Sequence, residues 1–466
     1  MGGRKDMDMT EGSIFGKLVR FCVPLLLGNL FQQLYNMVDT WVIGQSGNNA
    51  AYAAVGNVGP ITNILIGFFM GLSTGAGVVI SQYFGSKNDE KVRKAVHTAI
   101  TVTAILAVVF TAIGVIMTPM ILKAMLHVGS GGSNEVYEAA RTYLTIYFSG
   151  IAGLMLYNMC SGIMRAVGDS TRPFLFLLVA AAINVALDFI LSYWGNMGVS
   201  GVAIATISSQ GVSALLSLLS LMRSDAVVKV RLKELCIDRD SLKKILVIGL
   251  PAGVQTALTA FSNVFVQSYI SGTNGIQDVN MGAWTTYSKL DAFFFLPLQS
   301  MSLTMTTYVG QNLGVNNVER AKKGTRIAWL ICSITVIVFM VPVMAFTRPL
   351  AAFFRNDPDV IDGAVMLLRI LSPFYLFSCV NQTLMGSIRG AGNGTAPMII
   401  MLANFVGMRQ IYLFVMTRFI SNDLLPVGLS YPFGWICCAV SIFVYYEFFF
   451  DYSKYRITKY PAKTAE

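Results

Sequence analysis

Long apolar stretches separated by short polar connections run through the whole chain. Stretches of about 20 or more mostly apolar residues, enough for a helix to cross a bilayer, recur twelve times. Their apolar residues are continuous and include Gly and Pro, which favours helices over the alternating strands of a membrane barrel. The predicted spans are residues 14–43, 53–80, 95–121, 142–164, 173–194, 199–222, 245–271, 282–311, 327–347, 364–388, 396–420 and 425–450.

The overall composition supports a membrane protein. Hydrophobic residues make up 55% of the chain and charged residues only 12%, whereas soluble domains carry about 25% charged residues. A soluble core could not cover so much apolar surface, so lipid must cover much of it. We therefore predict an all-α integral membrane protein with twelve transmembrane helices.

The distribution of Lys and Arg predicts the orientation. Both termini and one alternating set of connections hold most of the 34 basic residues, and the opposite set holds Lys123, Arg141, Arg348, Arg355 and Arg418. Because cytoplasmic connections are enriched in Lys and Arg, both termini should be cytoplasmic and the chain should be a multi-pass protein of the cell membrane. The net charge of +10 does not indicate nucleic-acid binding, since the basic residues flank apolar runs and form no aromatic-interleaved stripe.

Two motifs occur twice in the same order. SQYFGSKNDEKVRKA (81–95) aligns with GQNLGVNNVERAKKG (310–324), and GIMRAVGDSTRP (162–173) aligns with GSIRGAGNGTAP (386–397). Pro24 and Pro251 open the two copies at equivalent points. Copies of six spans keep the same orientation, which predicts a parallel repeat of two six-helix bundles, 1–222 and 245–466, joined by a basic linker, 223–244. Two such bundles suit alternating access.

The first span contains a carboxylate, Asp39, in the stretch NMVDTWVIG. An ionised Asp at the bilayer centre costs roughly 2.5–3.5 kcal/mol on insertion scales. Helical spacing places Gln32, Tyr35, Asn36 and Asp39 on one stripe, which should face protein or a water-filled cavity. Pro24, earlier in the same span, removes a backbone donor and leaves this helix able to bend.

A second acid, Asp188, lies in the fifth span with Asn184 one turn before it. Thr206, in the next span, is close enough in sequence to face this pair. Two carboxylates in a poorly hydrated pocket cannot both stay ionised cheaply, so one of them could carry a proton. The same oxygen atoms could instead replace the hydration shell of a sodium ion, and interhelical hydrogen bonding is the structural alternative.

The paired motifs VISQYFGSKNDEKVRKA and YVGQNLGVNNVERAKKG, with RAVGDSTRP and RGAGNGTAP, resemble the multidrug and toxic compound extrusion (MATE) family over nearly the whole chain. Asp39, Asn184, Asp188 and Thr206 match the cation site of its DinF-like prokaryotic branch, and Pro24 matches the bending proline. The resemblance implies a non-enzymatic antiporter that exports small, amphipathic, cationic organic compounds in exchange for a proton or sodium. We expect a monomer that contacts membrane lipid and needs no cofactor or metal beyond that ion.

The second copy serves as an internal control for the site. Aligning the two copies places Val266 opposite Asp39, Met408 opposite Asn184 and Tyr412 opposite Asp188. If the acids were structural parts of the bundle, both copies should need them. The alignment therefore assigns the coupling chemistry to the first half.

The second half contains its own intramembrane charges, Lys289, Asp291 and Arg409. Residues two apart on a helix do not face each other, so Lys289 and Asp291 should have different partners. We expect a structural ion pair between Asp291 and Arg409, with a cavity-lining or gating role as the alternative. Asn158 is either a cavity-lining residue or part of an interhelical hydrogen bond.

Three other functions remain as alternatives. A flippase for lipid-linked precursors, from the wider superfamily, would favour a strongly cationic cavity, and few intramembrane cations occur. A membrane-embedded polyprenyl-phosphate enzyme would need an Asp-rich magnesium motif near a membrane face, and the sequence has none. A primary pump is disfavoured because the chain contains no Walker A stretch.

Overall fold

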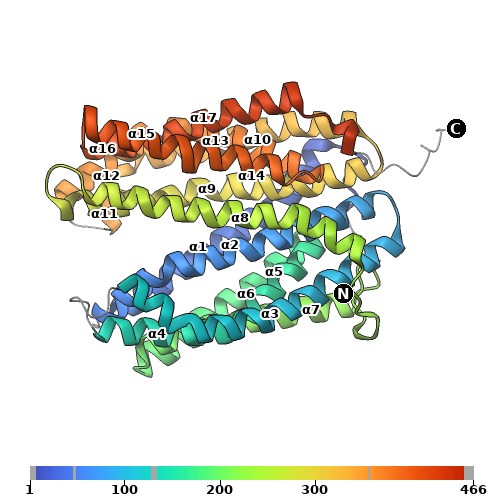
Figure 1. Ribbon diagram of the computed structural model, residues 1–466, viewed down its shortest axis with the longest axis horizontal. Coiled ribbons are helices and arrows are strands. Elements are labelled where there is room, and N and C mark those ends of the chain that lie inside the picture. Colours follow the sequence, from blue (N-terminus) through green and yellow to red (C-terminus); the bar gives the residue numbers. More distant parts are fainter. Residues whose placement is uncertain (1–6, 46–48, 127–133, 355–356, 456–466) are drawn as a thin grey trace. The chain divides into compact units, whose positions relative to one another are not determined.

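The computed structural model describes residues 7–45, 49–126, 134–354 and 357–455, and within these ranges the chain forms helices and connections without a strand (Figure 1). It divides into two units. The first contains Met1–Asp8 and Val23–Gly249, and the second contains Met9–Cys22 and Leu250–Glu466. The prediction of an all-α fold is confirmed.

The helices up to the linker correspond to the first six predicted spans. The fourth span is made by two helices, α4 and α5, bent by 47° relative to each other, and the fifth ends in a π-helical segment, η1. In chain order they are α1 (Ile14–Gln45), α2 (Asn49–Gly85), α3 (Asp89–Leu126), α4 (Asn134–Ser149), α5 (Ile151–Ala166), α6 (Thr171–Leu187), η1 (Asp188–Trp194) and α7 (Gly198–Met222).

The remaining helices correspond to the linker and the last six spans, and several of these spans are made of consecutive short helical segments. They are η2 (Leu232–Glu234), α8 (Arg239–Ser271), α9 (Gln277–Gly314), α10 (Val318–Ala345), α11 (Thr347–Phe354), α12 (Pro358–Leu371), η3 (Ser372–Phe374), α13 (Tyr375–Gly390), α14 (Thr395–Met401), η4 (Leu402–Met408), α15 (Arg409–Val415), η5 (Met416–Ile420), α16 (Leu424–Gly428), α17 (Ser430–Val444), η6 (Tyr445–Phe449) and η7 (Tyr452–Tyr455).

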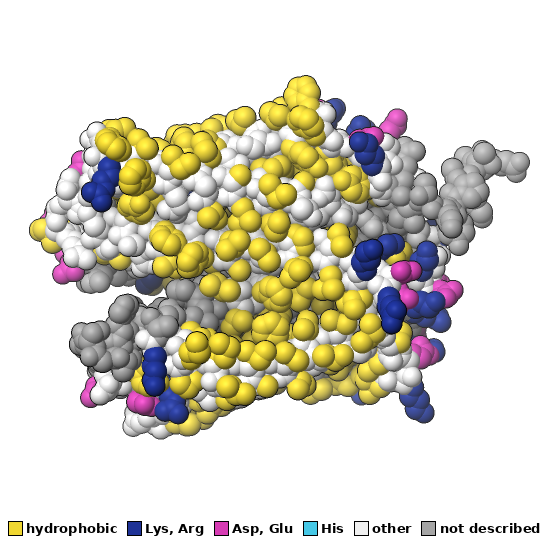
Figure 2. Space-filling model, viewed as in Figure 1, with side chains coloured by type: hydrophobic (Ala, Val, Ile, Leu, Met, Phe, Trp, Pro, Cys, Tyr) yellow, Lys and Arg dark blue, Asp and Glu magenta, His cyan; other side chains and the backbone are white. Residues whose placement is uncertain are grey.

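Most of these helices are apolar enough to cross a membrane. Ten spans in the described ranges pass on length and hydropathy, and α4 with α5 makes an eleventh. Large side chains such as Val108 (72% exposed) and Ile116 (76% exposed) cover the outside of α3, and Figure 2 shows hydrophobic side chains along the helices with charged side chains gathered at helix ends. Exposed apolar surface on this scale needs lipid to cover it.

The one remaining predicted span, the eighth (282–311), is α9, whose 38 residues reach about 57 Å at 1.5 Å per residue. It is less apolar because it carries many polar side chains, and these are buried inside the protein, among them Thr304, Gln311 and Asn312, each 0% exposed. Its polar residues therefore face other helices.

The backbone conformation of the turns follows the repeat. Lys87 and Asn316 adopt positive φ angles of 54° and 58° at equivalent positions after α2 and α9. Gly168 and Gly392 do the same, at 87° and 102°, in the turns after α5 and α13. Few non-glycine residues take a positive φ, so a matched pair of them is specific. The predicted internal repeat is confirmed.

Two long helices contribute to both units. Residues 14–22 of α1 belong to the second unit and the rest of α1 to the first, whereas α8 belongs to the first unit up to Gly249 and to the second from Leu250 onward. Pro24 and Pro251 lie within these helices, each two residues after the last residue of the preceding unit. Proline removes a helical hydrogen bond, so both helices have a weakened backbone at this point.

Candidate functional site

Packing of α1 against α6 sets the position of Asp39. Gly28 of α1 lies against Phe174 and Leu177 of α6, where an added Cβ would be 3.6 Å from Leu177. Asp39 follows Gly28 by eleven residues, and Asp188 follows Leu177 by eleven residues. Two helices that advance in the same direction from one contact rise by about 16 Å over that length, so the two acids reach the same level.

The outer part of α1 is held by apolar contacts to two other helices. Val42 packs in one cluster with Val199 and Val202 of α7, and Val38 and Tyr143 pack against this cluster. Because Asp39 lies between Val38 and Val42 in the helix, these contacts fix its position near α4, α6 and α7.

Asp188 is a buried acid that interacts with a second acid, Asp39. Asp188 is 0% exposed and Asn184 is 1% exposed. Both carboxylate oxygens of Asp188 and both polar atoms of the Asn184 amide lack a hydrogen-bond partner among the described residues. Asp188 is also the first residue of the π-helical segment η1, and π-helical turns are frequent at functional sites.

The two acids lie next to each other. The carboxyl groups of Asp39 and Asp188 interact directly, and the Tyr143 hydroxyl is close enough to be affected by the charge of both. Asp39 keeps partial exposure, but its Oδ1 is buried without a partner. The structure therefore brings together the two acids and Asn184, and most of their polar atoms are unsatisfied.

The hydroxyl of Thr206, which we expect to face the two acids, is bonded within its own helix. Its Oγ1 donates a hydrogen bond to the Val202 carbonyl, one turn earlier on α7, at 2.9 Å. One turn later, Gln210 donates to the Tyr35 hydroxyl at 3.4 Å, and its Oε1 is buried without a partner. The Thr206 donor is thus occupied, while the amide oxygen of Gln210 is available.

Gln210 and Tyr143 are therefore additional residues of the site that the sequence analysis missed. Gln210 lies four residues after Thr206, on the same face of α7, and this spacing could have identified it. Tyr143 and Tyr147 share a face of α4 in the same way, and their rings stack at 6.1 Å.

The other predicted cavity residues of the first half differ in their exposure and in their hydrogen-bond partners. Gln32 interacts with the Tyr35 hydroxyl, and Tyr35 is 7% exposed. Asn36 is exposed. The Asn158 amide donates to the Leu154 carbonyl of its own helix at 2.9 Å. Its donor is therefore used within α5 rather than across helices.

The expected ion pair between Asp291 and Arg409 is wrong. Asp291 accepts hydrogen bonds from the hydroxyls of Tyr287, at 3.1 Å, and Tyr375. Arg409 is 1% exposed, donates to Ser262 Oγ at 2.6 Å and to Asn263 Oδ1 at 3.0 Å. Asp291 is thus bonded by one tyrosine of its own helix and one of α13, and Arg409 by two residues of α8, so the two charges are not paired with each other.

Aromatic rings surround the cations of the second half. The Arg409 guanidinium lies 4.9 Å from the centre of the Tyr431 ring. Lys289 is an exposed residue whose ammonium lies 5.3 Å from the centre of the Phe354 ring. Such cation–π contacts contribute to the stabilisation of both charges.

At the positions equivalent to Asp39, Asn184 and Asp188, the second half has two apolar residues and a tyrosine whose hydroxyl is hydrogen-bonded. Val266 is 0% exposed and Met408 is 42% exposed. The Tyr412 hydroxyl donates to the Pro426 carbonyl at 3.1 Å, and its ring stacks on Phe433 at 4.8 Å. The unsatisfied cluster of the first half therefore has no counterpart at these positions of the second.

The MatE family model matches residues 24–190 and, a second time, residues 251–414. This chain belongs to the MatE family. The two MatE matches begin at Pro24 and at Pro251, the residues that open the two copies of the repeat. The family match thus supports the repeat boundaries found from the motifs, and both acids lie within the first match.

Curated relatives and solved structures agree with MatE membership. The chain is 27% identical to "Probable multidrug resistance protein YoeA" of Bacillus subtilis (strain 168), over 97% of this chain and 96% of that protein. It is 26% identical to "Probable multidrug resistance protein YpnP" of the same organism, over 95% and 97%. The structure of MATE in complex with MaL6 superposes with a TM-score of 0.89, at 22% identity, over 95% of this chain and 98% of that one. That likeness shows the MATE fold.

Proposed function

We propose that this MatE chain is a secondary active exporter of small, amphipathic, cationic organic compounds, which it exchanges for a proton or a sodium ion. It acts in the cell membrane as a monomer of the DinF-like branch, with both termini in the cytoplasm. The names of its relatives support multidrug export, and the Lys and Arg distribution supports the orientation.

The adjacent, unsatisfied acids carry the proposal for coupling. Asp39 and Asp188 lie side by side, and three of their oxygens are buried with no donor group of the described residues bonded to them. Two ionised carboxylates in this position repel each other and lose their hydration. A proton shared between them, or a sodium ion held by Asp39, Asp188 and the Asn184 and Gln210 amide oxygens, removes both penalties. The ion enters through Asp39, which is partly exposed, toward Asp188, which is not.

Helix α1 links ion binding to a conformational change. Asp39 and Pro24 lie on the same helix, and Pro24 lies close to the point where α1 leaves the second unit. An ion that binds Asp39 more tightly in one arrangement of α1 stabilises that arrangement by the difference in binding free energy. Release of the ion then allows the other arrangement.

Gradient-driven export by reconstituted protein tests the proposal. Proteoliposomes holding wild type, Asp39→Asn or Asp188→Asn are given a fluorescent organic cation and either a proton or a sodium gradient. Wild-type export should follow one of the two gradients. The gradient-driven export rate of each Asn variant should be lower than that of wild type by about tenfold or more, as expected when a group essential to the cycle is removed.

Val266→Ala and Tyr412→Phe, at the equivalent positions of the second half, are the matched controls and should keep the ion dependence. Full gradient-driven export by both Asn variants would contradict the proposed coupling site.

A further inference from the structure

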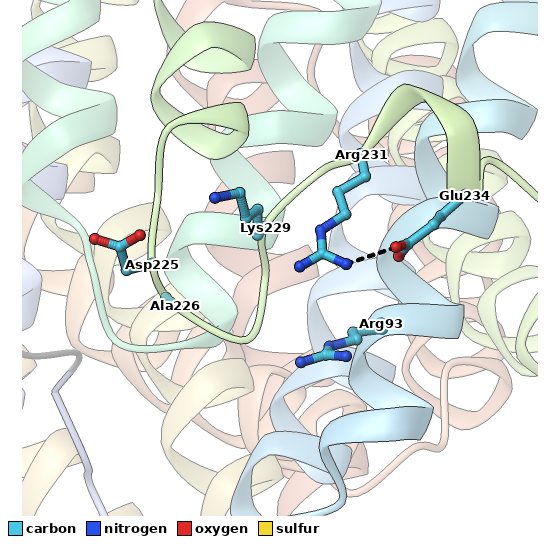
Figure 3. Close-up of a pocket in the computed structure, with 6 residues that line it drawn as sticks. All are labelled: Arg93, Asp225, Ala226, Lys229, Arg231 and Glu234. Carbon is cyan, nitrogen blue, oxygen red and sulfur yellow. Dashed lines mark hydrogen bonds and ion pairs between the residues drawn. The ribbon is translucent and has the colours of Figure 1, made fainter.

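A basic pocket lies where the linker after α7 meets the start of α3. It has a volume of about 170 Å³ and is lined by Arg93 of α3 and by five linker residues, Asp225, Ala226, Lys229, Arg231 and Glu234. Figure 3 shows Arg93 and Arg231 with their guanidiniums facing each other on one side, Asp225 on the other side, and Lys229 between them with its ammonium directed toward the Asp225 side. All of these residues belong to the first unit. We refer to these six residues as the linker pocket.

Hydrogen bonds hold the linker firmly over α3. His97 is 2% exposed, and its Nε2 accepts a hydrogen bond from the Arg231 backbone N–H at 3.1 Å. Its Nδ1 therefore carries the proton and donates to the Arg93 carbonyl at 2.8 Å. Thr98 accepts from the Asp238 N–H at 2.9 Å. One histidine thus ties together the two residues that face each other across the pocket.

Apolar burial fixes the same loop from below. Val228 and Val230, on either side of Lys229, are 3% and 1% exposed. The Lys229 N–H closes a turn onto the Ala226 carbonyl at 3.0 Å, and Lys229, between the two buried valines, is partly exposed and lines the pocket. The pocket is therefore built by the fold and does not depend on a freely moving loop.

The cations of the linker pocket outnumber the acids that neutralise them. Arg231 is paired with Glu234 at 2.7 Å (Figure 3). Hydrogen bonding to Arg231 lowers the pKa of the Glu234 carboxyl, and the charges of Arg231 and Arg93 lower it further. In the part of the chain that the structure describes, the side chains of Arg93 and Lys229 have no ion-pair or hydrogen-bond partner. A pocket with two uncommitted cations and a third nearby favours an anion with several acceptor oxygens.

Exposed apolar side chains lie beside this positive charge. Leu232, Leu235 and Ile237, in the same linker, are 58%, 39% and 47% exposed. The pocket lies at helix ends, since α7 ends at Met222 and α3 begins at Asp89, which is where a membrane-spanning bundle meets the lipid headgroups. A segment with basic and exposed apolar residues together is typical of a membrane-surface contact.

We propose that the linker pocket binds the phosphate group of an anionic phospholipid from the adjoining leaflet. Arg93 and Lys229 hold the phosphate oxygens, Arg231 contributes from the edge, and Leu232, Leu235 and Ile237 enter the acyl boundary beside the headgroup. A bound lipid would join the linker to the start of α3, and so would brace the connection between the two halves of the repeat. The apolar side chains favour a lipid over a free phosphate ion.

Lipid retention by the purified full-length chain tests the pocket. Native mass spectrometry measures the binding of phosphatidylglycerol against phosphatidylcholine to wild type, to Arg93→Gln, to Lys229→Gln and to the double variant. Each lost charge should weaken phosphatidylglycerol binding about fivefold, and the double variant roughly twenty-five-fold. Glu234→Gln, which frees Arg231, should strengthen it. Phosphatidylcholine binding should change little.

Lys233→Gln is the matched control, because Lys233 lies in the same linker as Lys229, in the helical turn Leu232–Glu234, and is exposed but does not line the pocket. If Lys233→Gln weakens phosphatidylglycerol binding as much as Lys229→Gln does, the lipid is attracted by the positive charge of the whole linker, and the proposal of a specific site in the linker pocket is wrong. A second arm adds inorganic phosphate. Displacement of phosphatidylglycerol only at high phosphate supports a lipid site, whereas tight phosphate binding with no preference for phosphatidylglycerol overturns it.

Discussion

Asp188 and Asp291, two acids of the predicted membrane spans, differ in their hydrogen-bond partners. Asp188 is 0% exposed, and neither oxygen has a hydrogen-bond donor among the described residues. Asp291, in the other half of the repeat, accepts from two tyrosine hydroxyls. A buried polar group that lacks partners destabilises a fold by about 1–3 kcal/mol, and one that has them contributes to stability. Burial alone therefore does not distinguish a structural acid from a functional one.

We predict that Asp188→Leu and Asp291→Leu change stability in opposite directions. Asp188→Leu removes an unsatisfied group and its repulsion with Asp39, so the midpoint of thermal unfolding in detergent should stay equal or rise. Asp291→Leu leaves the Tyr287 and Tyr375 hydroxyls without their acceptor and should lower stability by about 1–3 kcal/mol. Fluorescence-detected thermal unfolding of the purified variants measures both.

The two variants also serve as controls for each other, since both replace an intramembrane Asp by Leu. A marked loss of stability in Asp188→Leu would mean that Asp188 holds the helices together, and would remove the physical argument for a coupling role.

The repeat is visible at the scale of helix contacts as well as in sequence. Gly162 of α5 lies against Ser73 of α2, and an added Cβ would come within 2.9 Å of the Ser73 carbonyl oxygen. Gly386 of α13 lies against Ser302 of α9, with the corresponding distance 2.5 Å. The aligned motifs make these two pairs equivalent. Each half thus brings two helices together at the same glycine.

Replacing either glycine by alanine should separate its helix pair. Gly162→Ala and Gly386→Ala each force backbone to move, so each should lower stability by about 1–3 kcal/mol. Gly211 of α7 has open space around its Cβ position, and Gly211→Ala should stabilise by up to about 1 kcal/mol through helix propensity. Thermal unfolding of the three variants compares them, and equal behaviour of Gly211→Ala and Gly162→Ala would refute the contact argument.

Element positions could be predicted from the sequence because apolar length and turn residues are local properties. The twelve stretches each correspond to helices, including α9, whose buried polar residues lower its hydropathy. The bend between α4 and α5 and the π-helical start at Asp188 could not be predicted, since both depend on how neighbouring helices pack.

Side-chain partners were predicted less well than helices. Asp39 and Asp188 do lie together, because equal distances along two parallel helices follow from counting residues. The choice of tyrosine hydroxyls by Asp291, and of Ser262 and Asn263 by Arg409, depends on helix rotation and rotamers. A sequence shows which charges are present in the membrane but not which neutral groups reach them first.

At the scale of the whole molecule, one scaffold appears twice and the unsatisfied acids appear once. Helices α1 and α8 both pass from one unit to the other near a proline. Asp39 of α1 has Val266 as its equivalent in α8, whose own acid, Asp240, lies in the first turn of that helix. Under the proposed coupling, the repeated scaffold supplies two similar moving parts and the acidic pair makes only one of them responsive to an ion. The proposed ion binding would then act through α1.

The direction of transport depends on orientation, which the chain's own cysteines can report. Cys236 is the exposed cysteine, in the linker beside the basic pocket, whereas Cys22 and Cys437 are half-buried and the other four are buried. If the basic connections face the cytoplasm, a membrane-impermeant maleimide should leave Cys236 unlabelled in intact cells and label it in inside-out vesicles. Cys236→Ser should abolish that labelling and so identify the site. Strong labelling of wild type, absent in Cys236→Ser, in intact cells would place the linker outside, and would reverse both the export direction and the leaflet assigned to the bound lipid.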